Sequence, residues 1–268
     1  MSVPVIGDAI LSDGLPWERL RARVRLVPGL YQVLPRSAGN CLVCRRPVGA
    51  GYARCFQCEE HAGLGRGLLA DAVAPVSYAV RGTPFAKLLW QYKSWRDSDA
   101  SIRTSLLAML LVFLHDHGGC VWRAAGMAAP DRLAIVPSGC GRLGPHPLSR
   151  MVTPYLRLPV TSLELRPGLQ GRDFDASRFV AAKIGAAKIG AADSVAGANV
   201  LLLDDTWVSG ASIQSATAAL KLAGAARVVA VVLGRYVTPV ALPELMAGLG
   251  RADYDPAKCA ICRNPPIA

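Results

Sequence analysis

The segment Asn-Val-Leu-Leu-Leu-Asp-Asp-Thr-Trp-Val-Ser-Gly-Ala-Ser at 199–212 constrains the fold more strongly than any other part of the chain. Its run from Val200 to Leu203 is apolar without polar alternation, which is typical of a parallel strand buried on both faces. A stretch from Ala211 to Gly224 follows, with apolar residues at helical spacing and a glycine at its end. The segment predicts a strand, a short loop and a helix. It places Asp204 and Asp205 where the strand ends, and open α/β sheets bind ligands at that edge.

The loop after the two acids carries groups that suit a phosphate. Backbone N–H groups from Val208 to Ser212 precede the first helical hydrogen bonds, so they attract an anion. The two serine hydroxyls add donors, and Gly210 allows close approach of the backbone. A phosphate repels Asp204 and Asp205, which as acceptors suit the 2′- and 3′-hydroxyls of a ribose. The segment predicts a ribose 5-phosphate site; the alternative is an ordinary strand-turn-helix with an acidic helix cap.

This strand, acid pair and Ser/Gly loop resemble the phosphoribosyltransferase signature, with mild departures at Val208 and Ala211. The resemblance implies an α/β fold, with a type I phosphoribosyltransferase-like parallel sheet flanked by helices. It also implies that phosphoribosyl pyrophosphate (PRPP) binds with Mg²⁺. Asp204 and Asp205 then act as the catalytic residues that hold the ribose. The implied 5′-phosphate site comprises Thr206, Val208, Ser209, Gly210, Ala211 and Ser212.

A second loop follows a short apolar run at 133–136. Phosphoribosyltransferases hold pyrophosphate in a loop after an earlier strand, and the resemblance assigns that role to Ser138, Gly139 and Arg142; the alternative is a tight turn with an incidental arginine. Val136-Pro137 also resembles an element of the ComF family, whose members carry a zinc ribbon. The segment 88–93 resembles a ComF helix that ends in a lysine, but Gly-Pro-His-Pro-Leu at 144–148 replaces a ComF Arg-Gly-Phe-Asn-Gln motif. These departures indicate a divergent branch.

Two Cys-x-x-Cys pairs, Cys41/Cys44 and Cys55/Cys58, are separated by ten residues. Four thiolates at this spacing predict a closed structural zinc site in a small ribbon over 39–62. Disulfides are the competing interpretation, and the lack of a recognisable signal peptide argues against them. A redox role is weaker, because neither pair is predicted at a strand-to-helix junction.

The remaining four cysteines are weaker evidence for a metal site. Cys259 and Cys262 form a third pair, which favours a reduced turn in the tail. The alternative is a second metal site completed by cysteines from elsewhere. Cys120 is expected to be a half-buried apolar residue and Cys140 a neutral space-filler.

The chain is expected to divide into a helical N-terminal lead over 1–38, the ribbon over 39–62, a phosphoribosyltransferase-like domain over 70–240 and a C-terminal tail over 241–268. Helices are predicted at 17–24, 85–95 and 102–115, the second capped by Thr83 with Pro84 in its first turn. Further strands are predicted at 76–80 and 227–233. The repeated Ala-Ala-Lys-Ile-Gly at 181–190 is interpreted as a loop or frayed helix.

Composition narrows the choice of partners. The net charge is +11, from 30 basic and 19 acidic residues, which favours anionic partners such as nucleotides or nucleic acid. The longest apolar run, Leu106 to Leu114, is too short for a membrane span, and a cytoplasmic location is expected. Oligomeric state stays open, with a homodimer as one option.

The predicted function is transfer of a phosphoribosyl group from PRPP to an unidentified nitrogenous acceptor, with release of pyrophosphate. One alternative is a ComF-like protein of DNA uptake that binds single-stranded DNA, because Arg45, Arg46 and Arg54 give the ribbon a basic face. The other alternative is a PRPP sensor without catalysis.

Overall fold

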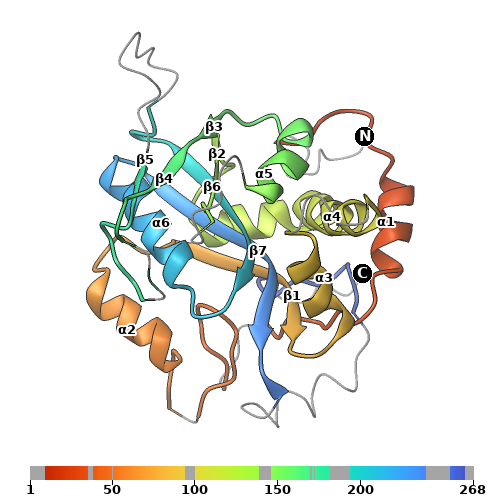
Figure 1. Ribbon diagram of the computed structural model, residues 1–268, viewed down its shortest axis with the longest axis horizontal. Coiled ribbons are helices and arrows are strands. Elements are labelled where there is room, and N and C mark those ends of the chain that lie inside the picture. Colours follow the sequence, from red (N-terminus) through yellow and green to blue (C-terminus); the bar gives the residue numbers. More distant parts are fainter. Residues whose placement is uncertain are drawn as a thin grey trace.

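A computed structural model describes residues 10–35, 39–49, 51–93, 100–138, 146–169, 171, 173–181, 194–239 and 254–262. Its centre is a five-stranded parallel sheet in the order β1-β7-β6-β2-β3 (Figure 1). A separate antiparallel pair joins β4 to β5. The strands are β1 (Ala72–Val80), β2 (Arg132–Ile135), β3 (Val160–Thr161), β4 (Leu163–Leu165), β5 (Phe179–Ala181), β6 (Asn199–Trp207) and β7 (Arg227–Val237). The predicted mixed α/β fold with a helix-flanked parallel sheet is confirmed.

Both faces of the sheet are covered, as the unbroken apolar strands require. Strand β6 shows the alternation, because Leu201 and Leu203 pack in one core cluster while Val200 and Leu202 pack in the other. The first cluster lies under α4 (Ala100–Ala124), α3 (Pro84–Gln91) and α5 (Pro147–Val152), with α1 (Trp17–Arg25) packed on α4. The second lies under α6 (Ala211–Leu222), the β4-β5 pair and the cysteine segment that leads into α2 (Phe56–Leu64). Figure 1 shows this division, with α1, α3 and α4 on one side and α2 and α6 on the other.

Helix α4 is longer than predicted. The sequence placed its end at His115, yet it continues through Gly118 and Gly119 to Ala124. A Cβ on Gly118 would lie 3.2 Å from the Trp122 ring, so this glycine makes room for a buried tryptophan instead of ending the helix. By length and composition α4 is the one described helix that could cross a membrane, but 67% of its most apolar stretch is buried inside the protein.

The remaining helices and strands match the predictions only in part. Helices α1 and α3 are present, with Pro84 in the first turn of α3, but the Thr83 hydroxyl donates to the Val80 carbonyl at 2.7 Å instead of capping the helix. The sequence analysis missed α2, α5 and the short strands β3, β4 and β5, which are two or three residues long. The repeat at 181–190 lies outside the described residues except for Ala181, which ends β5. The predicted domain boundaries stay predictions, although Ile10 and Cys259 both pack in the main core cluster.

The order of the strands defines one special position in the sheet. From β2 the chain moves to β3 on one side, then returns to β6 on the other side of β2. The connections therefore diverge between β2 and β6, and ligands of open α/β sheets bind at such a switch point, beyond the carboxyl ends of the strands.

The opposite, amino edge of the sheet is held by Asp71. Its carboxylate accepts from the Val228 N–H at 2.7 Å and pairs with Lys221 at 2.7 Å and Arg227 at 2.9 Å. Burial alone would raise the pKa of Asp71, but these hydrogen bonds outweigh it and hold the pKa below its ordinary value. The ionised carboxylate therefore stabilises the junction of β1, α6 and β7.

Replacing Asp71 by asparagine is expected to lower the free energy of unfolding by about 1–3 kcal/mol at pH 7. Because the folded pKa is depressed, the difference from wild type is present above the ordinary aspartate pKa and shrinks as pH falls through the lower folded value. Urea unfolding from pH 7 to pH 3 measures it. Asp13→Asn is the control, since Asp13 pairs with Arg157 but its side chain is 92% exposed. Equal effects of the two substitutions, or a difference independent of pH, would contradict this account.

Candidate functional site

A cavity of about 360 Å³ opens at the switch point between β2 and β6. Its wall includes Val136, Pro137 and Ser138 after β2, and the stretch from Asp204 to Thr206 at the end of β6. Ser212 in the first turn of α6 also lines it. Of the residues assigned from the sequence, the structure thus brings both acids, Thr206, Val208, Ser212 and Ser138 to one cavity. Gly139 and Arg142 lie outside the described residues.

Asp205 is held from the α3 side of the sheet. Only 2% of the residue is exposed, and its carboxylate accepts a short hydrogen bond from the Tyr92 hydroxyl. Lys93 Nζ lies 2.9 Å from the other carboxylate oxygen, Oδ1, and His146 Nε2 lies 3.7 Å from Oδ2, which Tyr92 contacts. This carboxylate therefore anchors Lys93 in the cavity wall, where a cation can meet an anionic ligand.

Asp204 lies one strand position earlier and so points to the opposite face, towards α6. Its carboxylate accepts from the Asp205 backbone N–H at 2.8 Å. Burial and the neighbouring Asp205 raise the pKa of Asp204 well above its ordinary value, and Lys93 opposes this only in part. Two adjacent carboxylates that cannot easily ionise together favour a cation or hydrogen-bond donors as ligand. The motif assigns both acids the same role, whereas in the structure Asp204 is half-buried and Asp205 is fully buried.

The loop between β6 and α6 is short and its shape is fixed by Gly210. This residue adopts φ +90° at the N-cap of α6, and the ring of Trp207 packs against it. The Ser209 hydroxyl accepts from the Ala211 N–H at 3.3 Å. The loop thereby presents the N-terminus of a twelve-residue helix to the cavity, with the Ser212 side chain beside it. This arrangement attracts an anion.

Arg235 on β7 joins this loop to the first cysteine cluster. The residue is 2% exposed, and its Nη1 donates to the carbonyls of Trp207 at 3.1 Å and Val208 at 2.9 Å. Its Nη2 donates to Cys44 Sγ at 3.5 Å. A buried guanidinium without a counter-charge is costly, and thiolates at this position supply one.

The predicted four-cysteine group is present at 41–58. The ligand atoms of Cys41, Cys44, Cys55 and Cys58 all lie within 4.8 Å of one another, and the residues are buried. The Cys44 and Cys55 sulfurs are 3.7 Å apart, which matches the sulfur separation of roughly 3.8 Å in a tetrahedral zinc–thiolate site. The group can therefore hold a structural metal such as zinc. No coordination position stays open for a reaction.

The local structure of the second cysteine pair differs from the predicted ribbon. Asn40 and Pro47 form an antiparallel bridge around the first pair, but Cys55 is the N-cap of α2 and Cys58 lies in its first turn. The nearby His61 packs against Phe174, with ring centroids 5.8 Å apart. Burial lowers the pKa of His61.

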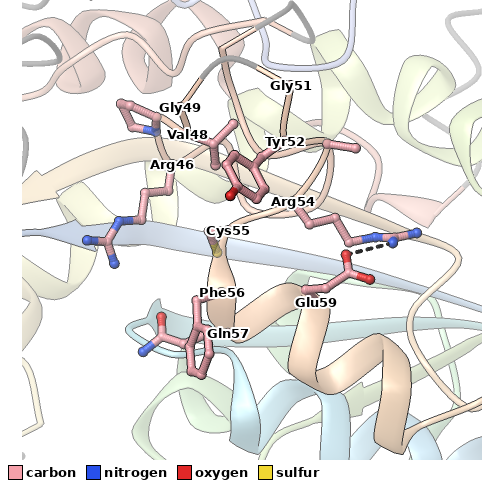
Figure 2. A pocket seen from close by; sticks show the side chains of 12 residues that line it. Arg46, Val48, Gly49, Gly51, Tyr52, Arg54, Cys55, Phe56, Gln57 and Glu59 are labelled. Carbon is pink, nitrogen blue, oxygen red and sulfur yellow. Dashed lines mark hydrogen bonds and ion pairs between the residues drawn. The ribbon is translucent and has the colours of Figure 1, made fainter.

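A second, larger hollow of about 880 Å³ lies on the outer surface of this cysteine module. Figure 2 shows Tyr52 and Phe56 among its lining side chains, together with Arg46 and with Arg54 paired to Glu59 at 3.0 Å. Tyr52 is 71% and Phe56 82% exposed. Of the three arginines predicted to form a basic face, Arg46 and Arg54 line this hollow, whereas Arg45 is buried.

No protein-family model matches the chain, and no curated protein matches it. The resemblance to phosphoribosyltransferases therefore stays a prediction from the sequence motifs.

Gly210→Ala is expected to lower the free energy of unfolding by roughly 2–4 kcal/mol. A Cβ there would lie 2.1 Å from the buried Trp207 ring, which adds overpacking to the cost of a left-handed backbone. Gly197→Ala is the matched control, because Gly197 has φ +74° but open space around it. Urea unfolding of both variants isolates the contribution of the contact with Trp207. Equal losses would show that Trp207 does not fix the loop.

Proposed function

We propose that the protein is a phosphoribosyltransferase of type I architecture that binds PRPP and Mg²⁺ at the switch-point cavity. The observation that carries the proposal is the joint presence in one cavity of Asp204, the N-terminus of α6 with Ser212, and Ser138 from the neighbouring strand. A phosphorylated ribose needs an anion site and acceptors for its two hydroxyls; the N-terminus of α6 with Ser212 would be the first, and Asp204 the second.

The 5′-phosphate would bind the backbone N–H groups and hydroxyls at 208–212. Asp204 would accept from the ribose hydroxyls, while Lys93, held by Asp205, would face the pyrophosphate together with Ser138. Asp205 would thus serve as a positioning residue for Lys93. This refines the role that the motif alone assigns to the second acid.

A divalent cation fits the donors present, because carboxylate and phosphate oxygens are the ligands that Mg²⁺ prefers. Bound with PRPP, it would neutralise charge on the pyrophosphate. The pKa of Asp204 stays raised although Lys93 lies close to the acid pair, and a bound cation would offset more of that negative charge.

In the reaction, the bond between C1 of the ribose and the pyrophosphate oxygen breaks, and its electron pair leaves with pyrophosphate. The lone pair of the acceptor nitrogen then forms the new C1–N bond, and the acceptor's proton is released to water. Positive charge develops on the ribose ring in between, and the Asp204 carboxylate can stabilise it. The protein supplies placement and electrostatics, without a covalent nucleophile.

The acceptor would enter beside Trp90, whose side chain lines the cavity and is 74% exposed. An exposed indole gives a planar nitrogenous heterocycle a stacking surface. This supports a flat aromatic acceptor over an aliphatic amine.

Calorimetric titration with PRPP and Mg²⁺ tests the binding step. Asp204→Asn is expected to weaken PRPP binding about tenfold or more, the cost of a lost charged hydrogen bond. Because burial disfavours the charged form of Asp204, the substitution should leave the fold at least as stable. Asp131→Asn, an exposed carboxylate just before β2 at the opposite edge, is the control and should bind like wild type.

Ribose 5-phosphate should bind more weakly than PRPP at the same site. Undiminished PRPP binding by Asp204→Asn would contradict the assignment. Tight binding without pyrophosphate release across a panel of heterocyclic acceptors would favour the sensor over the enzyme.

A second candidate function is binding of single-stranded nucleic acid by the cysteine module. It is favoured by the exposed Tyr52 and Phe56 beside Arg46, because aromatic faces stack on bases and arginine contacts the backbone (Figure 2).

If this surface binds single-stranded DNA, Tyr52→Ala combined with Phe56→Ala should weaken binding by about tenfold or more. Fluorescence anisotropy at 50 and 200 mM salt measures the affinity and its salt dependence. Leu222→Ala removes another exposed apolar side chain, on α6, and should have no effect. Salt-independent or unchanged affinity would exclude this role.

A further inference from the structure

A second group of metal-ligating side chains lies apart from the cavity and from the first cysteine cluster. His117 and Cys120 lie one turn apart on α4, and Cys259 and Cys262 belong to the C-terminal segment 254–262. The ligand atoms of these four residues lie within 4.8 Å of one another, and the three cysteines form no disulfide. The sequence analysis favoured a reduced turn for the third pair and an apolar role for Cys120; the structure instead gathers them with a histidine.

The histidine is oriented as a metal ligand. His117 is 4% exposed, and its Nε2 lies 2.7 Å from the Pro256 carbonyl oxygen. A carbonyl accepts only, so Nε2 carries the proton and the lone pair of Nδ1 faces Cys262 Sγ at 3.5 Å. A backbone carbonyl that fixes the second ring nitrogen is typical of metal-bound histidine.

The tail pair has the local geometry of the first cluster. Backbone N–H groups of Ile261 and Cys262 donate to Cys259 Sγ at 3.4 and 3.1 Å. Cys44 N–H donates to Cys41 Sγ at 3.5 Å in the same way. In both pairs the backbone turns around the first sulfur and stabilises it as a thiolate, the form that binds metal.

The three sulfurs are close together. Cys262 Sγ lies 2.9 Å from Cys259 Sγ and 2.6 Å from Cys120 Sγ. A tetrahedral metal would separate them to roughly 3.8 Å. Rotation of the Cys120 and Cys262 side chains, both only half-buried, can provide that movement.

We propose that His117, Cys120, Cys259 and Cys262 form a second structural zinc site, which fastens the C-terminal segment to α4. Three thiolates and one imidazole are a ligand set typical of structural zinc. With four protein ligands the site is closed, so its role is to hold structure.

The segment that the metal would hold lies against Arg45 of the first cluster and against the ends of β1 and β7. Arg45, 1% exposed, donates from Nε to the Ala260 carbonyl at 3.3 Å and from Nη1 to the Cys41 carbonyl at 3.4 Å. Ala260 itself is buried with Tyr78 and Val237 at the ends of β1 and β7. The tail zinc would therefore brace the side of the sheet that also supports the first cluster.

The test is the zinc content of the full chain, purified under reducing conditions and measured by mass spectrometry of the metal. Wild type is expected to hold two zinc ions, and Cys262→Ser and Cys44→Ser one each. Cys140→Ser, which alters a cysteine of neither group, should keep two. His117→Cys should restore a four-ligand site and keep two, whereas His117→Ala should lose one.

A measurement on the wild type keeps the test independent of folding of the variants. X-ray absorption at the zinc edge should show seven sulfurs and one nitrogen shared between two ions. One zinc per chain with sulfur ligands alone, or a disulfide among Cys120, Cys259 and Cys262 in the reduced preparation, would overturn the proposal. Neither outcome bears on PRPP binding, which the calorimetry tests separately.

Discussion

The contact of Arg235 with Cys44 and with the carbonyls of Trp207 and Val208 is the interaction on which the arrangement of the site depends. A buried guanidinium requires nearby negative charge and acceptors for its N–H groups. The four cysteines would supply this charge as thiolates around a bound metal, and the two carbonyls supply acceptors. One side chain thus connects the metal module to the loop that would hold the phosphate. In this account the first cysteine cluster stabilises the geometry of the site without taking part in chemistry.

The same principle applies to two further contacts. Asp205 pairs with Lys93, two residues after α3, and Arg45 joins the first cluster to the C-terminal segment. Each contact places a charged or polar group in a buried position where its partner comes from a distant part of the sequence. The sheet provides the rigid frame, and these few polar contacts determine where its carboxyl edge can accept a ligand. Such contacts link the first cysteine cluster to the C-terminal segment and to the loop beside the cavity.

Local sequence patterns were sufficient to predict the central strand, loop and helix of the fold. The apolar run of β6 and the apolar spacing at 211–224 predicted a strand, a turn and a helix, because burial on both faces and helical periodicity are visible in the sequence. The first cysteine cluster could also be predicted from the sequence, since its four cysteines lie within 18 residues. The continuation of α4 past two glycines could not be predicted from the sequence, because it depends on the packing of Trp122 against Gly118. Contacts such as Tyr92 with Asp205, and Cys120 with Cys262, join residues more than 100 positions apart. No local pattern specifies such pairs.

The central claim is that a phosphorylated ribose binds at the carboxyl ends of β2 and β6. The most direct test is a crystal structure of the protein with PRPP and Mg²⁺. The account predicts the 5′-phosphate within hydrogen-bonding distance of the N–H groups at 208–212, with the ribose hydroxyls against Asp204. A ligand bound elsewhere, with Asp204 turned away from the sugar, would contradict it.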